Sequence, residues 1–76
     1  MTLAEAKLAI IKLNLIHAGT AGEWATETDS LIWIESNIFD QAGIKSSINT
    51  DFGERLAFWV KDQLQAEMDG EMNRTA

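Results

Sequence analysis

The chain of 76 residues contains no cysteine and no proline. Without cysteine it can form neither a disulfide framework nor a cysteine-based zinc site, and it has no thiol nucleophile. It also lacks any run of the roughly 18 uncharged apolar residues that a membrane-spanning helix needs. With 46% hydrophobic residues, the chain is expected to be one small globular domain. A small domain without disulfides fits a reducing compartment, so we expect a cytoplasmic protein.

Basic residues are scarce, with six Lys and Arg against twelve Asp and Glu, for a net charge of −6. The imbalance lies mostly in residues 18–51, where six acids face a single base, Lys45. Nucleic-acid backbones and anionic membranes attract positive charge, so we expect no direct binding to either. The acidic middle of the chain favours a basic protein partner instead.

Three segments with apolar residues at helical spacing predict an all-α fold, a small three-helix domain. A competing interpretation takes Ile11-Lys12-Leu13-Asn14-Leu15, which alternates between apolar and polar residues, as a β-strand. The single domain is expected over residues 1–76, with helices at about 3–17, 29–42 and 51–69 and a frayed tail at 70–76.

Each predicted helix follows a residue whose side chain can cap it and precedes a glycine. A capping oxygen accepts a hydrogen bond from a free N–H group of the first turn. Glycine suits the other end because it adopts the left-handed conformation without strain. The expected N-terminal caps are Thr2 (with Glu5), Thr28 and Asp51 (with Glu54), and the expected terminal glycines are Gly19, Gly43 and Gly70.

The first predicted helix has two apolar faces, whereas a surface helix normally has one. We expect the face with Leu8 and Ile11 to pack inside. The opposite face, with Leu3, Ile10 and Leu13, is then expected to mediate self-association as a homodimer. The expected core comprises Leu8, Ile11, Leu15, Leu31, Ile34, Ile38, Phe52, Leu56, Trp59, Val60 and Leu64.

Two aromatic residues fall on otherwise polar helix faces. Trp33 shares its face with Asn37 and Asp40, and Phe58 lies among charged residues of the third predicted helix. Exposed aromatic residues ringed by polar groups are typical anchors of protein interfaces. We therefore predict a partner-binding site made of Trp33, Asn37, Asp40 and Glu27, with Phe58 as a further candidate. The alternative is that the preceding loop covers Trp33 and makes it part of the core.

No set of residues suggests catalysis. His17 is the only histidine, and nothing in the sequence pairs it with a serine such as Ser30. No closely spaced series of Asp and Asn residues forms a calcium loop, and no glycine-rich phosphate loop is present. We therefore expect no catalytic residue, no metal and no cofactor.

The triplet Asp29-Ser30-Leu31, at the start of a predicted helix, offers one alternative. It resembles the attachment site of acyl and peptidyl carrier proteins. The resemblance implies a phosphopantetheine group on Ser30. The chain departs from the carrier pattern before the triplet, where Thr26-Glu27-Thr28 stand in place of the usual glycine. It departs again after the triplet, because Ile32-Trp33-Ile34 replace an acidic recognition helix.

A short acidic helical chain with surplus apolar surface is best interpreted as a protein-binding module. In size and charge it is similar to the small inhibitors that bacteriophages make against host defence or transcription, anti-CRISPR proteins among them. A concrete version is a competitive inhibitor that mimics nucleic acid on the basic surface of its target. A phage structural or assembly protein is the remaining alternative.

Overall fold

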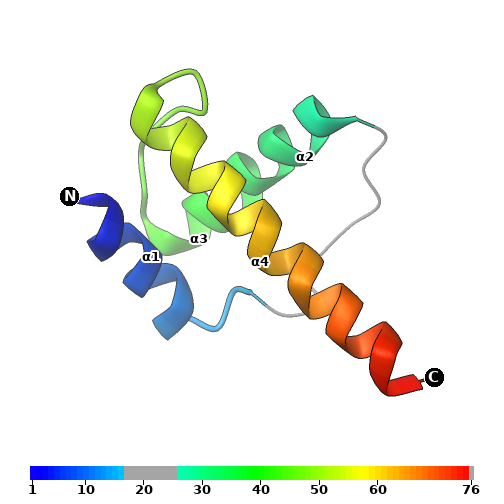
Figure 1. Ribbon diagram of the computed structural model, residues 1–76. Coiled ribbons are helices and arrows are strands. Elements are labelled where there is room, and N and C mark those ends of the chain that lie inside the picture. Colours follow the sequence, from blue (N-terminus) through cyan, green and yellow to red (C-terminus); the bar gives the residue numbers. More distant parts are fainter. Residues whose placement is uncertain (17–25, 76) are drawn as a thin grey trace.

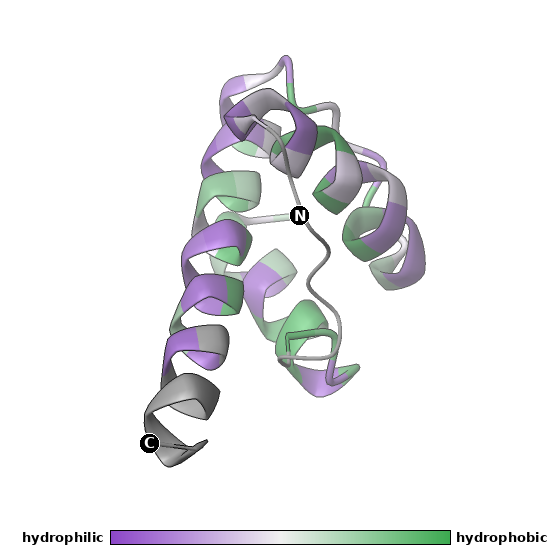
Figure 2. Ribbon diagram, turned by 90° about the vertical axis from the view of Figure 1, so that its right-hand side faces the viewer, coloured by the Kyte–Doolittle hydropathy of each residue, from purple (hydrophilic) through white to green (hydrophobic). Residues whose placement is uncertain are grey.

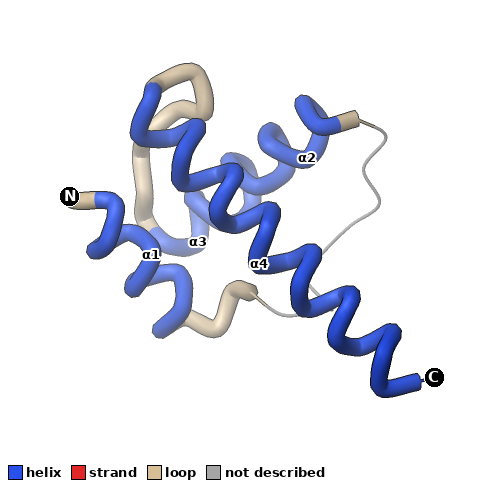
Figure 3. Tube along the Cα trace, in the orientation of Figure 1, coloured by secondary structure: helices blue, strands red, loops and turns tan. Residues whose placement is uncertain are grey.

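The computed structural model describes residues 1–16 and 26–75, with the backbone alone for residue 68 and residues 70–75. Within these residues every regular element is helical and there is no strand, as Figure 3 shows. The chain is therefore a small all-α domain, as predicted, and the strand interpretation of residues 11–15 is wrong. Its elements are α1 (Leu3–Lys12), α2 (Glu27–Ile34), the π-helical segment η2 (Glu35–Phe39), α3 (Asp40–Ala42) and α4 (Asp51–Thr75).

The long helix α4 organises the domain (Figure 1). The elements α2, η2 and α3 follow one another without a break as a single helix over residues 27–42, here called the middle helix. Both α1 and α2 pack against α4, and α1 also contacts α3. Green and purple segments alternate along the helices in Figure 2, as expected of amphipathic helices with one buried side.

Helix α1 begins as predicted and ends earlier. The Thr2 backbone N–H donates to the Glu5 carboxylate (2.9 Å), and the Glu5 N–H donates to the Thr2 hydroxyl (3.1 Å), which completes a capping box. The helix stops at Lys12 instead of residue 17. Asn14 takes the left-handed conformation (φ 54°), and the N–H groups of Asn14 and Leu15 donate to the carbonyls of Ile11 and Ile10. Asparagine tolerates this conformation, so it ends the helix before the expected Gly19, which lies outside the described residues.

The middle helix begins two residues earlier than predicted. The Thr26 hydroxyl, and not that of Thr28, accepts a hydrogen bond from the Asp29 N–H group (3.1 Å). This start places both Glu27 and Asp29 in the first turn, where the helix dipole favours negative charge.

The end of the middle helix agrees with the sequence. Gly43 is left-handed (φ 71°). The Gly43 N–H donates to the Asp40 carbonyl (3.2 Å), and the Ile44 N–H donates to the Phe39 carbonyl (2.9 Å). These two bonds form a Schellman motif, and the accompanying apolar contact is provided by the burial of Ile44 in the same cluster as Phe39.

A π-helical segment interrupts the middle helix and changes which residues face the core. In a π-helix each turn holds more residues than in an α-helix, so the side chains that follow are rotated from their α-helical positions. Ile38 and Phe39, adjacent in sequence, are both fully buried as a result. Phe39 is not among the core residues expected from the sequence, because a uniform α-helical spacing does not foresee this widening.

Helix α4 is capped by Thr50, one residue before the expected Asp51. The Thr50 hydroxyl accepts a hydrogen bond from the Gly53 N–H (3.1 Å). The helix does not stop at Gly70 and continues to Thr75.

The loop of residues 43–50 lies directly on the first turn of α4. Gly53 is buried there, and a β-carbon at this position would fall far inside contact distance of the Ser47 carbonyl group. From the other side, the Glu35 carboxylate accepts a hydrogen bond from the Ile48 N–H (2.7 Å). The loop is thus fixed both to α4 and to the middle helix.

The core agrees with the sequence on the middle helix and α4 but not on α1. Leu8 and Ile11 were expected inside and are 50% and 57% exposed, whereas Ala6 and Ile10 are fully buried. Leu15, also expected inside, follows the helix end at Lys12 and is half-buried against the core cluster. The small Ala6 side chain instead lets α1 approach its neighbours closely. The fully or nearly fully buried apolar residues are Ala6, Ile10, Ile34, Ile38, Phe39, Ile44, Leu56, Ala57, Val60 and Leu64.

We predict that Gly53→Ala destabilises the domain by about 1–3 kcal/mol, because the added methyl group forces the loop away from α4. The direction of the change in stability is informative, because replacing glycine by alanine inside a helix ordinarily stabilises the helix by up to about 1 kcal/mol. Urea unfolding followed by circular dichroism measures the change. Ala66→Gly, at an exposed position of the same helix, supplies the ordinary propensity effect for comparison. A stabilised Gly53→Ala variant would contradict the close packing of the loop.

We also predict a pH-dependent contribution from the cap of α1. Hydrogen bonds from the Thr2 backbone and side chain lower the pKa of Glu5 below its ordinary value of 4.5. A lowered pKa means that the ionised carboxylate stabilises the fold above the ordinary value, and that this contribution is lost as pH falls through the lowered one. The melting temperature of the wild type should therefore exceed that of Glu5→Gln at neutral pH and converge with it in acid. A difference that is constant with pH would exclude the carboxylate as its source.

Candidate functional site

The predicted anchor Trp33 is only half-buried, and it packs against the core cluster. Asn37, its predicted neighbour, uses its side-chain amide to donate a hydrogen bond to the Trp33 backbone carbonyl (2.9 Å). This bond lies where α2 continues into η2. Trp33 and Asn37 therefore both contribute to the structure of the middle helix.

The other predicted contact residues lie on the middle helix and on α4. Glu27 is exposed and pairs with Lys61 of α4 (3.4 Å), which joins the two helices across the surface. Asp40 is exposed near the end of the middle helix. Phe58 is half-buried on α4 and lies outside the core cluster. The predicted site thus combines residues with structural contacts and residues exposed to solvent.

The exposed side of the middle helix carries a different apolar residue, Ile32. Its side chain is 48% exposed. Asp29 precedes it by three residues and Ser36 follows by four, so the three side chains share one face of the helix. Asp40, also exposed, lies four residues beyond Ser36. We call the surface formed by Asp29, Ile32, Ser36 and Asp40 the acidic face.

The acidic face is not neutralised by its own helix, because residues 27–42 contain four acids and no Lys or Arg. Two of the acids have structural partners: Glu27 pairs with Lys61, and Glu35 accepts the Ile48 N–H. Within the described part of the chain, the remaining two, Asp29 and Asp40, form no ion pair. Their charge is therefore available to a partner on both sides of Ile32.

Sequence reasoning missed Ile32 because it assigned the apolar stripe by hydrophobicity. The helix begins at Thr26 and changes pitch at Glu35, so the face turned to solvent includes one large aliphatic side chain. The signal that could have identified Ile32 was the pair of acids, Asp29 and Asp40, which lie before and after it at helical spacing.

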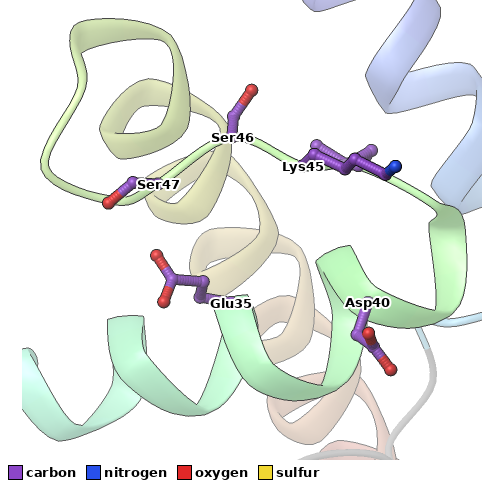
Figure 4. Close-up of a pocket in the computed structure, with 6 residues that line it drawn as sticks. Glu35, Asp40, Lys45, Ser46 and Ser47 are labelled. Atoms are coloured by element: carbon purple, nitrogen blue, oxygen red, sulfur yellow. The ribbon is translucent and has the colours of Figure 1, made fainter.

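A shallow hollow of about 340 Å³ lies between the end of the middle helix and the following loop. Its lining includes Glu35, Asp40, Lys45 and Ser47. Figure 4 shows Glu35 extending toward the loop at Ser47, whereas the Asp40 carboxylate points away from that loop. The polar groups do not converge on a common point, so the hollow lacks the arrangement that a small-molecule site requires.

Ser30 is almost fully buried, with 1% of its surface exposed. Its hydroxyl donates a hydrogen bond to the Glu27 carbonyl one turn earlier (2.6 Å). An attachment serine of a carrier protein must be reached by a modifying enzyme, and this hydroxyl faces the interior of the domain. The structure therefore gives the carrier interpretation no support.

Other sites considered in the sequence have no structural counterpart in the part of the chain that the structure describes. No group of three or more His, Asp or Glu residues could hold a metal ion there. No helix there is long and apolar enough to cross a membrane. His17 lies outside the described residues.

The self-association residues proposed for α1 are only partly on the surface. Leu13 is 53% exposed, but Leu3 is half-buried against the core and Ile10 is fully buried. Ile10 therefore cannot contribute to an interface without unfolding the domain, and its placement on an outer face is wrong. The outward side of α1 carries Leu8 and Ile11 instead.

Comparison of the chain with protein-family models, with curated proteins and with solved structures gave no match in any of the three.

We predict that Ser30 is not modified by a promiscuous phosphopantetheinyl transferase in the presence of coenzyme A. Its burial and its hydrogen bond to Glu27 keep the hydroxyl from the enzyme. Mass spectrometry of the intact protein should show an unchanged mass, while a known carrier protein in the same reaction gains the group. Stoichiometric addition at Ser30 would restore the carrier interpretation.

Proposed function

We propose that the protein is an acidic docking module that binds a basic protein partner through the acidic face. The observation that carries the proposal is the setting of Ile32, a large aliphatic side chain nearly half exposed between two acids that pair with no base among the described residues. The middle helix offers no positive charge to compensate them. A basic surface with a small apolar recess would complement this arrangement.

The two kinds of residue would act differently in binding. Burying Ile32 removes apolar surface from water and holds the complex together, which mainly affects the dissociation rate. Asp29 and Asp40 attract a positive surface over a distance, which mainly affects the association rate and its dependence on salt. The net charge of −6 adds to this attraction.

The most specific form of the proposal is an inhibitor that occupies a nucleic-acid-binding surface of its target. Such surfaces are basic, and an acidic helix competes with a phosphate backbone for them. Small phage inhibitors, including anti-CRISPR proteins, are of this kind in size and charge. Displacement of the bound protein by excess double-stranded DNA would distinguish this form from docking elsewhere on the partner, as in a phage assembly protein.

We predict that Ile32→Ser weakens partner binding about tenfold or more, mainly through faster dissociation. The stability of the domain should change by no more than about 0.5 kcal/mol, because the side chain is half exposed and outside the core cluster. The partner is the basic protein that the tagged wild-type chain retains at low salt. Surface plasmon resonance with this partner measures the association and dissociation rates. Unchanged binding by Ile32→Ser would exclude the acidic face as the docking surface.

The acids are tested by the combined change Asp29→Asn and Asp40→Asn. We expect slower association and a flatter dependence on salt, with little change in dissociation. The matched control is Asp62→Asn with Glu67→Gln, which removes the same charge from exposed positions of α4. If both pairs slow association equally, net charge alone attracts the partner, and the acidic face has no special role.

A further inference from the structure

The outward side of α1 is apolar although it faces solvent. Leu8 is 50% exposed and Ile11 is 57% exposed. Ala4 lies one turn before Leu8 on the same face and is also exposed, as is Met1 at the beginning of the chain. We call the surface formed by Met1, Ala4, Leu8 and Ile11 the α1 strip. Because α1 already buries Ala6 and Ile10 on its inner side, the strip is apolar surface in excess of what the fold requires.

Charged residues border the strip in an ordered way. Glu5 and Lys12 are seven residues apart, which is close to two helical turns, so they lie along the same edge of α1. One is near the beginning of the helix and the other at its end. The other edge carries Lys7, whose ammonium group lies 5.3 Å from the centre of the Trp59 ring of α4. Lys7 thus lies against its own domain, whereas Lys12 and Glu5, whose carboxylate also caps the helix, are exposed on the opposite edge.

We propose that a second copy of the chain binds to the α1 strip, with the two α1 helices antiparallel. A two-fold axis perpendicular to both helices keeps the Glu5–Lys12 edge of each copy on the same side of the interface. Glu5 of each copy then faces Lys12 of the other, and Leu8 lies near the axis. The dimer therefore contains two opposite-charge pairs beside a continuous apolar contact. This interface is separate from the acidic face and does not depend on the function proposed for it.

The same charges favour the antiparallel over the parallel arrangement. In a two-fold dimer of parallel α1 helices the axis runs along the helices, so the Glu5–Lys12 edges of the two copies lie on opposite sides of the interface and the pairs between Glu5 and Lys12 are lost. The distribution of charge along one edge therefore selects both the occupant, a second copy, and its direction. A partner of uniformly positive or negative charge would match only one end of this edge.

The contact extends beyond α1 at its far end. A hollow of about 190 Å³ beside Ile11 is lined by Asn14, Ile16, Gln63 and Glu67. An antiparallel second α1 begins next to this hollow, so the Met1 side chain of the second copy is the group nearest to it. The helix itself is short, at 10 residues, so the interface belongs to the small class that gives weak dimers.

The first test measures the molecular mass by analytical ultracentrifugation at increasing protein concentration. We expect the mass to rise from 8.4 kDa toward twice this value over the micromolar to millimolar range. Leu8→Glu should raise the dimer dissociation constant at least about tenfold, because it places two charges near the axis. Ile32→Glu is the matched control: it adds the same acid at an equally exposed aliphatic position of the middle helix and should leave the dimer intact.

The second test exchanges the charges. Glu5→Lys alone and Lys12→Glu alone should each weaken the homodimer roughly tenfold, because each creates two like-charge pairs. Mixing the two variants should restore association as a heterodimer, in which Lys at position 5 faces Glu at position 12 and Lys12 faces Glu5. Loss of the α1 cap in Glu5→Lys cannot produce this rescue, so the readout separates charge pairing from folding.

Three results would overturn the proposal. The wild type would remain at the monomer mass up to millimolar concentration, Leu8→Glu and Ile32→Glu would affect the mass equally, or the mixed charge variants would fail to associate. The first two would remove the second copy from the α1 strip. The third would remove the antiparallel direction.

Discussion

The structure depends on the close contact between Gly53 and the backbone at Ser47. Because Gly53 has no side chain, the loop of residues 43–50 lies directly on the first turn of α4. Glu35 holds the same loop from the middle helix through the Ile48 N–H. These two contacts tie the loop to α4 and to the middle helix, and the two helices pack against each other. The acidic face is therefore the side of the middle helix that lies opposite the core.

The domain presents two exposed surfaces of different chemistry. The acidic face combines one aliphatic residue with negative charge, whereas the α1 strip is apolar with charges of both signs along one edge. A small domain has little core to spare, so large aliphatic side chains left outside it carry a cost in solubility. Two such surfaces on a chain of 76 residues are best explained if each is covered by a protein.

Much of the fold could be predicted from local signals. The capping box at Thr2 and the left-handed Gly43 were identified correctly, because both depend on a few adjacent residues. The end of α1 was not predicted correctly, because the left-handed conformation of Asn14 competes with continuation of the helix through this residue. The inner face of α1 was not predicted correctly either. Both faces of this helix are apolar, and packing against residues distant in the sequence decides which of them is buried. Burial of Ile10 instead of Leu8 follows from that packing.

The candidate site was predicted only in outline. Negative charge on the middle helix could be counted from the sequence, and Asp40 is indeed exposed. The aromatic anchor was misplaced because Trp33 packs against the core and the exposed apolar residue is Ile32. Both effects come from where the helix starts and from its change of pitch, which a uniform helical wheel does not include.

The change of pitch has a consequence for how the chain tolerates altered length. A π-helical turn is equivalent to an α-helix that has accepted one additional residue. In this chain the additional residue lies within Glu35–Phe39 and is accommodated without breaking the helix. That insertion fixes the rotation about the helix axis of the residues that follow, including the left-handed Gly43 and the loop that lies on Gly53. A one-residue deletion in this segment would restore a regular helix yet turn the following loop away from α4, so the segment's length is as constrained as its composition.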